Sequence, residues 1–160
     1  MKKEFLLVLL TVTSFVQINA QTLPRQYVIT ADTDTKQLLQ NNYWQVLQDE
    51  NDKFNIDDVQ REPLANQFAN FTKDSKEDFA KTTWFRFNIK NSASKILKLS
   101  ITSDAAVTDF YIPDGNGVMH HFTTGTKIPW RKKNGFKKDN AIPFEIKPEE
   151  QILIFAKTIV

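Results

Sequence analysis

Apolar and polar residues alternate most clearly between Thr83 and Lys90. Phe85 and Ile89 fall on one face of an extended chain, whereas Trp84 and Arg86 fall on the other. Alternation over this length is typical of a β-strand with two chemically different faces. We therefore predict a strand here, with the phenylalanine-bearing face in a hydrophobic core.

Comparable stretches recur along the chain, separated by residues that favour turns. The further strands are expected at 43–48, 96–101, 107–112, 118–123, 141–146 and 151–158. The intervening turns are expected at 49–52, 91–94, 113–117 and 147–150. Short strands at such intervals predict an all-β fold, an antiparallel jelly-roll-like β-sandwich with one short helix.

The short helix is expected after the first of these strands. Asn55 is suited to cap the free amide of Asp57 or Asp58. These two carboxylates also lie favourably at the positive end of the helix dipole. The helix should end by Glu62, because Pro63 disfavours helical geometry in the residue before it.

Residues 1–20 have the pattern of a secretory signal peptide. Lys2 and Lys3 precede an apolar core, and cleavage after Ala20 leaves Gln21 as the first mature residue. An uncleaved membrane anchor is the alternative. The apolar core is shorter than the roughly 20 residues that span a bilayer, so we favour the cleaved signal peptide and an exported protein.

The remaining chain divides into a polar leader at 21–42, with one weak helix or strand at 36–39, and a sandwich domain at 43–160. Val160 still lies in a strand pattern. We therefore expect a truncated product or a fragment of something larger.

The amino-acid composition excludes several kinds of functional site. The absence of cysteine excludes disulfides, thiolate zinc sites and a thiol nucleophile. Residues 1–20 hold two of the 21 Lys and Arg and one of the 19 Asp and Glu, so the remainder is almost neutral. Nucleic acid is not expected as a partner, because phosphate binding needs a dense positive face.

Four residues on two predicted strands form a candidate ligand-binding site. Trp84 and Arg86 share one face of their strand, and Asp109 and Tyr111 share one face of theirs. If these faces coincide, two aromatic rings, a guanidinium and a carboxylate converge. That combination suits a sugar, whose CH face stacks on the rings while charged groups bind its hydroxyls.

A structural role is the alternative for the same residues. Arg86 and Asp109 then form a cross-strand ion pair, an ordinary stabiliser of sheets, with Trp84 and Tyr111 packed around it.

No metal or other cofactor is expected. His120 and His121 are adjacent on a strand and so point to opposite faces, which prevents both from gripping one ion. Asp114 and Asn116 could offer oxygens to calcium, but the spaced acidic series of a calcium loop is missing and an ordinary turn is favoured.

The segment from Arg131 to Lys138 is a cluster of positive charge beside Trp130. Lipid headgroups or an anionic polysaccharide are possible partners, and a solvated loop is the more ordinary interpretation.

The sequence does not indicate an enzyme. It has no glycine-rich phosphate loop, no nucleophile-elbow serine and no series of metal ligands. A pair of carboxylates for glycoside hydrolysis stays open, because their separation is not visible in sequence.

The order of segments resembles the extracellular domain of bacterial seven-transmembrane receptors with diverse intracellular signalling modules. The stretches that carry the likeness are 43–49 (YWQVLQD), 54–59 (FNIDDV), 83–91 (TWFRFNIKN), 107–115 (VTDFYIPDG), 124–129 (TGTKIP) and 144–148 (FEIKP). The likeness covers about 43–160.

This resemblance implies a jelly-roll sensor module at the periplasmic or outer face of a bacterial membrane, thought to bind carbohydrate-like or other small ligands. In that family seven membrane helices and a cytoplasmic output domain follow, and this sequence contains neither. A secreted polysaccharide-binding or adhesion module that does not signal is the alternative function.

Overall fold

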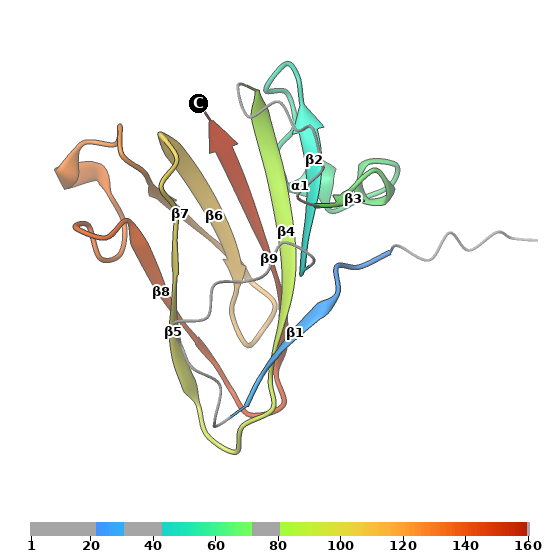
Figure 1. The fold of residues 1–160 in the computed structure, drawn as a ribbon, viewed down its shortest axis with the longest axis vertical. Coiled ribbons are helices and arrows are strands. Elements are labelled where there is room, and N and C mark those ends of the chain that lie inside the picture. The colour runs from blue at the N-terminus through green and yellow to red at the C-terminus, as the bar shows by residue number, and fades with distance from the viewer. Residues whose placement is uncertain (1–21, 31–42, 72–80, 160) are drawn as a thin grey trace, which may run out of the picture.

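The computed structural model describes residues 22–30, 43–71 and 81–159. These residues form two sheets that pack face to face (Figure 1). The predicted fold class, an all-β antiparallel sandwich with one short α-helix, is confirmed. The predicted weak element at 36–39 and the signal peptide lie outside the described residues.

The larger sheet has the strand order β3-β2-β4-β9-β6-β7, with β1 also paired to β4. Its strands are β1 (Gln26–Ile29), β2 (Trp44–Asp49), β3 (Ala69–Asn70), β4 (Thr82–Asn91), β6 (Val107–Pro113), β7 (Met119–Thr124) and β9 (Gln151–Ile159). The smaller sheet pairs β5 (Leu97–Thr102) with β8 (Ala141–Ile146). Strand β9, from the end of the chain, therefore lies between β4 and β6.

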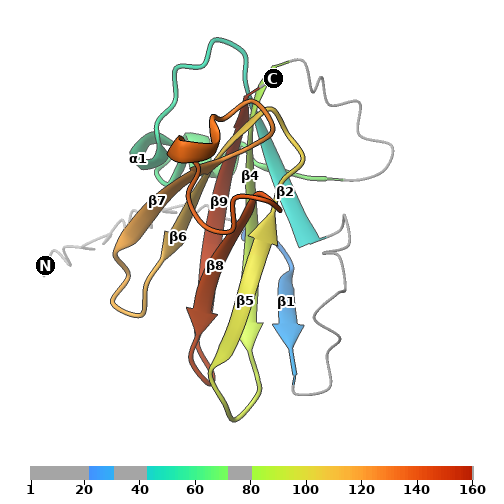
Figure 2. The same ribbon diagram turned by 90° about the vertical axis from the view of Figure 1, so that its left-hand side faces the viewer.

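The main core fills the space between the two sheets. Phe85, Phe87 and Ile89 contribute to it from β4, as the alternation predicts, and Ile142 and Ile146 contribute from β8. Burial of these side chains stabilises each by about 1.5 to 3 kcal/mol relative to exposure. The smaller sheet covers one face of the larger sheet, as seen when the ribbon is turned (Figure 2).

A second core lies on the opposite, outer face of the larger sheet. The segment with α1 (Ile56–Val59) and the 3₁₀ turn η2 (Leu64–Asn66) covers part of this face. Val59 and Phe68 pack there against Trp84 and Phe155. Both faces of β4 are therefore buried in the middle of the molecule.

Helix α1 begins as the sequence predicts. The side chain of Asn55 accepts from the amide of Asp58, and the carboxylate of Asp58 accepts from the amide of Asn55. This reciprocal pair is a capping box, which satisfies two amides that the helix leaves free. The helix stops at Val59, within the predicted limit.

Strand β1 is a difference from the sequence analysis, which placed residues 21–42 in a polar leader. Gln26–Ile29 pairs in parallel with the last residues of β4, from Asn88 to Asn91. A four-residue strand gives too short a pattern to stand out. Among the described strands, its pair with β4 is parallel and the other pairs are antiparallel.

Within the described ranges, none of the helices has the length and apolar character needed to cross a membrane.

Candidate functional site

The four sequence-predicted residues do share the outer face of the larger sheet. Cross-strand register aligns Trp84 with Lys157 and Asp109, and in the next row Arg86 with Phe155 and Tyr111. Because directly opposed residues of a sheet point to the same side, the predicted coincidence of faces is present. One strand, β9, separates the two pairs.

Trp84 lies in the buried part of this face. Its side chain is 0% exposed and stacks on Tyr111, with 5.6 Å between ring centroids. Tyr111 in turn stacks on His121 from β7 at 4.8 Å. Three rings thus form a continuous stack that runs from the buried core to the exposed edge at His121.

Lys157 links the segment that contains α1 to this stack of rings. Its Nζ lies 5.4 Å from the Trp84 ring centroid, donates to the carbonyl of Phe54 and forms an ion pair with Asp52. The side chain is largely buried, so these contacts hold the start of the α1 segment over the sheet.

Arg86 is buried away from Asp109. Its Nε donates to Oε1 of Gln45 at 2.8 Å, its Nη2 donates to the carbonyl of Thr22 at 2.8 Å, and its guanidinium lies over the Phe68 ring. Burial lowers the pKa of Arg86 to about 10, so it remains charged at neutral pH. The alternative of an Arg86–Asp109 ion pair is therefore wrong, because β9 intervenes between β4 and β6.

Asp109 instead pairs with β7. Its Oδ1 lies 2.8 Å from Nε2 of His121 and also accepts from the hydroxyl of Thr123. Burial and, to a lesser degree, the negative charge of Asp109 raise the pKa of Tyr111. The phenol is therefore protonated and able to donate a hydrogen bond at neutral pH.

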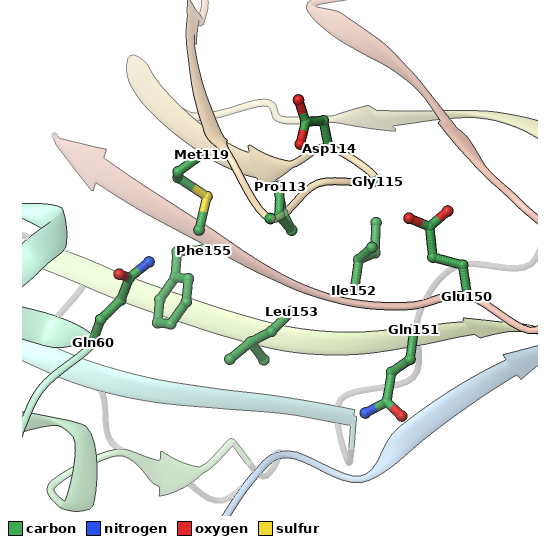
Figure 3. A pocket seen from close by; sticks show the side chains of 11 residues that line it. Gln60, Pro113, Asp114, Gly115, Met119, Glu150, Gln151, Ile152, Leu153 and Phe155 are labelled. Atoms are coloured by element: carbon green, nitrogen blue, oxygen red, sulfur yellow. The ribbon is translucent and has the colours of Figure 1, made fainter.

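An open groove lies on the same outer face, beyond the row of Tyr111. Its volume is about 450 Å³. Figure 3 shows Met119, Leu153 and Phe155 along the groove, with Gln60 at one end and Glu150 at the other. The groove therefore combines an apolar floor with polar ends, the arrangement that small-molecule sites commonly have.

The turn between β6 and β7 forms one wall of the groove. Asp114 holds this turn, because its Oδ1 accepts from the amides of Asn116 and Val118 and its Oδ2 lies 3.1 Å from Nε2 of His120. These hydrogen bonds, with that of His120 the largest effect, lower the pKa of Asp114. The wall is thus fixed by an ionised carboxylate.

A second hollow of about 570 Å³ lies above Arg86, at the other side of the outer face. Thr22, Arg25, Gln45, Phe68 and Asn70 are among the residues that line it. The segment at 22–25 forms part of its wall and supplies the carbonyl that Arg86 binds.

The structure divides the predicted site residues into two groups. Trp84 and Arg86 are 0% exposed, whereas Asp109 and Tyr111 are only partly buried. The groove residues Gln60, Met119 and Leu153 were not found from sequence. In the sequence, these residues were marked only by the alternating pattern of polar and apolar positions. That pattern did not show which face of β7 and β9 the α1 segment leaves uncovered.

The two adjacent histidines contact different partners. His120 lies against Asp114 in the turn, and His121 lies against Asp109 on the outer face. Across residues 22–30, 43–71 and 81–159, no three histidine or acidic side chains gather in a way that could hold a metal ion.

Comparison with family models identifies the family of this chain. A search of curated proteins finds no match. The family model described as 7TMR-DISM extracellular 2 matches residues 41–158, which run from before β2 to all but the last residue of β9 and leave out β1. The chain therefore belongs to the 7TMR-DISM extracellular 2 family and is an extracellular sensor module of the seven-transmembrane receptors that the sequence resembles.

Proposed function

We propose that this chain is the ligand-binding domain of a bacterial receptor, and that it binds a carbohydrate-like small molecule in the groove on its outer face. Residues 1–20 serve as the signal peptide, and the domain acts in the periplasm or at the cell surface. Binding is reversible and involves no chemical turnover of the ligand.

The groove is the observation that carries this proposal. Met119 and Leu153, which are partly exposed, offer apolar surface to the CH groups of a sugar ring, and the buried Phe155 lies beneath them. Gln60, Gln151 and Glu150 place amide and carboxylate groups at the ends, where they suit the hydroxyls of the same ring.

Two of the sequence-predicted residues stand beside the groove. Tyr111 occupies the row next to that of Leu153 on the same face and Asp109 the row after it, and both retain some exposure. A ligand longer than one ring would reach Tyr111 along the sheet. Trp84 supports Tyr111 through the ring stack, whereas the partners of Arg86, Gln45 and Thr22, line the second hollow.

Signalling requires a ligand to favour one receptor state over another. The groove is bounded by two turns and by the α1 segment, which come from different parts of the chain. A ligand that contacts all three biases any change in their relative positions by its difference in affinity between the two arrangements.

The experiment is a screen of the purified full chain against an array of neutral, amino and acidic oligosaccharides, followed by calorimetry on each hit. The groove-filling variant Met119→Trp should abolish binding. Its matched control is Val118→Trp, which places the same ring at the next, exposed position. Equal binding by wild type and Met119→Trp, or no hit on the array, would contradict the proposal, and cleavage of a hit would contradict binding without turnover.

A further inference from the structure

The connection between β7 and β8 contains a strongly basic segment, residues 127–138, which we call the basic loop. It holds six Lys and Arg residues and no acidic residue, and Asp139 follows it directly. Within the described part of the chain, no ion pair involves any of the six cations. Their charge is therefore available to a partner.

Two large aromatic side chains are exposed in the same loop. Trp130 is 60% exposed and Phe136 is 58% exposed. Single exposed apolar residues are ordinary on protein surfaces, but two aromatic rings among six cations form a distinct combination. Tryptophan with lysine and arginine is the composition found where proteins meet a membrane surface.

Hydrogen bonds hold the basic loop in a defined conformation. Asn134 donates its amide to the carbonyl of Thr123 and accepts from the amide of Thr123 through Oδ1. Phe136 bridges to Ala141, and Nζ of Lys133 donates to Oδ1 of Asn140. Trp130 lies in the short 3₁₀ turn η3 (Trp130–Lys132). The exposed rings therefore belong to an ordered loop whose backbone is held by these hydrogen bonds.

The loop lies at the opposite end of the sheet from the groove. Thr124, which ends β7, pairs with Thr108, and Ile159 near the end of β9 pairs with Val107. Both ribbon views place η3 at the same end of the molecule as the end of β9 (Figures 1 and 2). The groove lies at the other end of β6, beside Pro113 and Asp114.

We propose that the basic loop docks the domain onto the surface of an anionic lipid bilayer. The cations meet lipid phosphates, and the rings of Trp130 and Phe136 enter the interface between headgroups and acyl chains. The aromatic rings favour a bilayer over a soluble polyanion, because only the bilayer removes their apolar surface from water. Docked in this way, the domain holds its groove away from the membrane and open to solvent.

The test is sedimentation of the full chain with vesicles of phosphatidylcholine, alone or mixed with phosphatidylglycerol. Binding is expected only with the anionic lipid, and it should weaken between about 0.1 M and about 1 M NaCl, since the Debye length falls from about 10 Å to about 3 Å. The tryptophan fluorescence of the protein should shift to shorter wavelength on binding, because Trp130 is exposed before binding, and Trp130→Ser should remove this shift. No binding to the anionic vesicles would overturn the proposal.

Two sets of variants separate charge from aromatic insertion. The triple variant Arg131→Glu, Lys132→Glu and Lys138→Glu should weaken binding by about a hundredfold or more, because each basic residue at an anionic surface contributes a factor of about five. A triple variant of equal charge change at other exposed positions, Lys53→Glu, Arg61→Glu and Lys95→Glu, is the matched control and should bind several-fold more tightly than the loop variant. Equal effects of the two triples would show that only net charge matters and would contradict the proposal.

The double variant Trp130→Ser and Phe136→Ser should weaken binding by about tenfold or more. Its control is Ile96→Ser with Val118→Ser, two exposed apolar residues elsewhere. If the aromatic double variant binds vesicles like wild type while dextran sulfate competes fully, the loop is a polyanion site and the membrane proposal is wrong. The outcome is independent of the sugar screen, because the loop and the groove lie at opposite ends of β6.

Discussion

Arg86 donates a hydrogen bond from Nε to Oε1 of Gln45, which lies directly opposite it on β2. Both side chains are buried, and the guanidinium also contacts the backbone carbonyl of Thr22 and the Phe68 ring. A buried cation held by neutral groups has the desolvation cost of its charge without the compensation of a carboxylate.

This arrangement predicts different costs for two substitutions of Arg86. Arg86→Ala leaves Oε1 of Gln45 without its donor and opens a cavity beside Phe68, so it should lower the free energy of unfolding by about 3 kcal/mol. Arg86→Met removes the same charge but fills most of that volume, so it should be less destabilising than alanine by about 1 to 2 kcal/mol. Urea unfolding measures both. Equal loss in the two variants would mean that the charge, and not the packing, matters.

The stack of Trp84, Tyr111 and His121 predicts a division between stability and recognition. Trp84→Ala empties a fully buried site and should lower the free energy of unfolding by about 3 to 5 kcal/mol. Tyr111→Ala removes a partly exposed ring and should cost less, about 1 to 2 kcal/mol, while weakening ligands that extend past the groove. Thermal unfolding and calorimetry separate the two effects. A folded Trp84→Ala protein with wild-type stability would refute the packing role.

Alternation was sufficient to predict β4 and to assign Phe85 and Ile89 to the core. It gave the two faces of the strand but not the fact that both are buried, because the α1 segment that covers Trp84 packs through tertiary contacts far along the chain. The capping box at Asn55 was predictable because its hydrogen bonds are local.

The contacts of Arg86 and Asp109 were beyond sequence reasoning for a related reason. Which strands are neighbours depends on the whole topology, and β9 enters between β4 and β6 from the far end of the chain. The groove follows from the same placement, since its floor comes from β9 and its wall from the turn after β6.

The turn at Asp114 predicts a pH dependence. The pKa of Asp114 is lowered from 3.8 by hydrogen bonds from His120 and from the turn amides. A carboxyl with a depressed folded pKa contributes stability that is fully present above its unfolded value and is lost as pH falls through the folded pKa. The stability advantage of wild type over Asp114→Asn should therefore be constant above about pH 5 and decline below 3.8.

The carboxyl carbon of Asp114, followed by NMR during an acid titration, checks the cause. His120→Ala should move the midpoint up towards 3.8, because the largest of the hydrogen bonds is removed. An unchanged midpoint in His120→Ala would assign the shift to the backbone amides alone.

Two glycines with positive φ predict contrasting costs for the same substitution. A Cβ at Gly125 would collide with the backbone carbonyl of Ala106, whereas a Cβ at Gly117 meets nothing within 4 Å. Gly117→Ala should cost about 1 kcal/mol, for the left-handed backbone alone. Gly125→Ala should cost at least about 2 kcal/mol more, because rigid backbone must move. Similar melting temperatures for the two variants would contradict this placement of the β7–β8 connection.

The most direct measurement of the central claim is an amide NMR titration of the labelled protein with the tightest sugar from the array. We predict that the largest chemical-shift changes map to Gly115, Gly117 and Leu153 around the groove, with smaller changes at Tyr111, and that they are absent in Met119→Trp. Changes centred instead on Thr22 and Asn70, or spread evenly over the surface, would show that the groove is not the binding site.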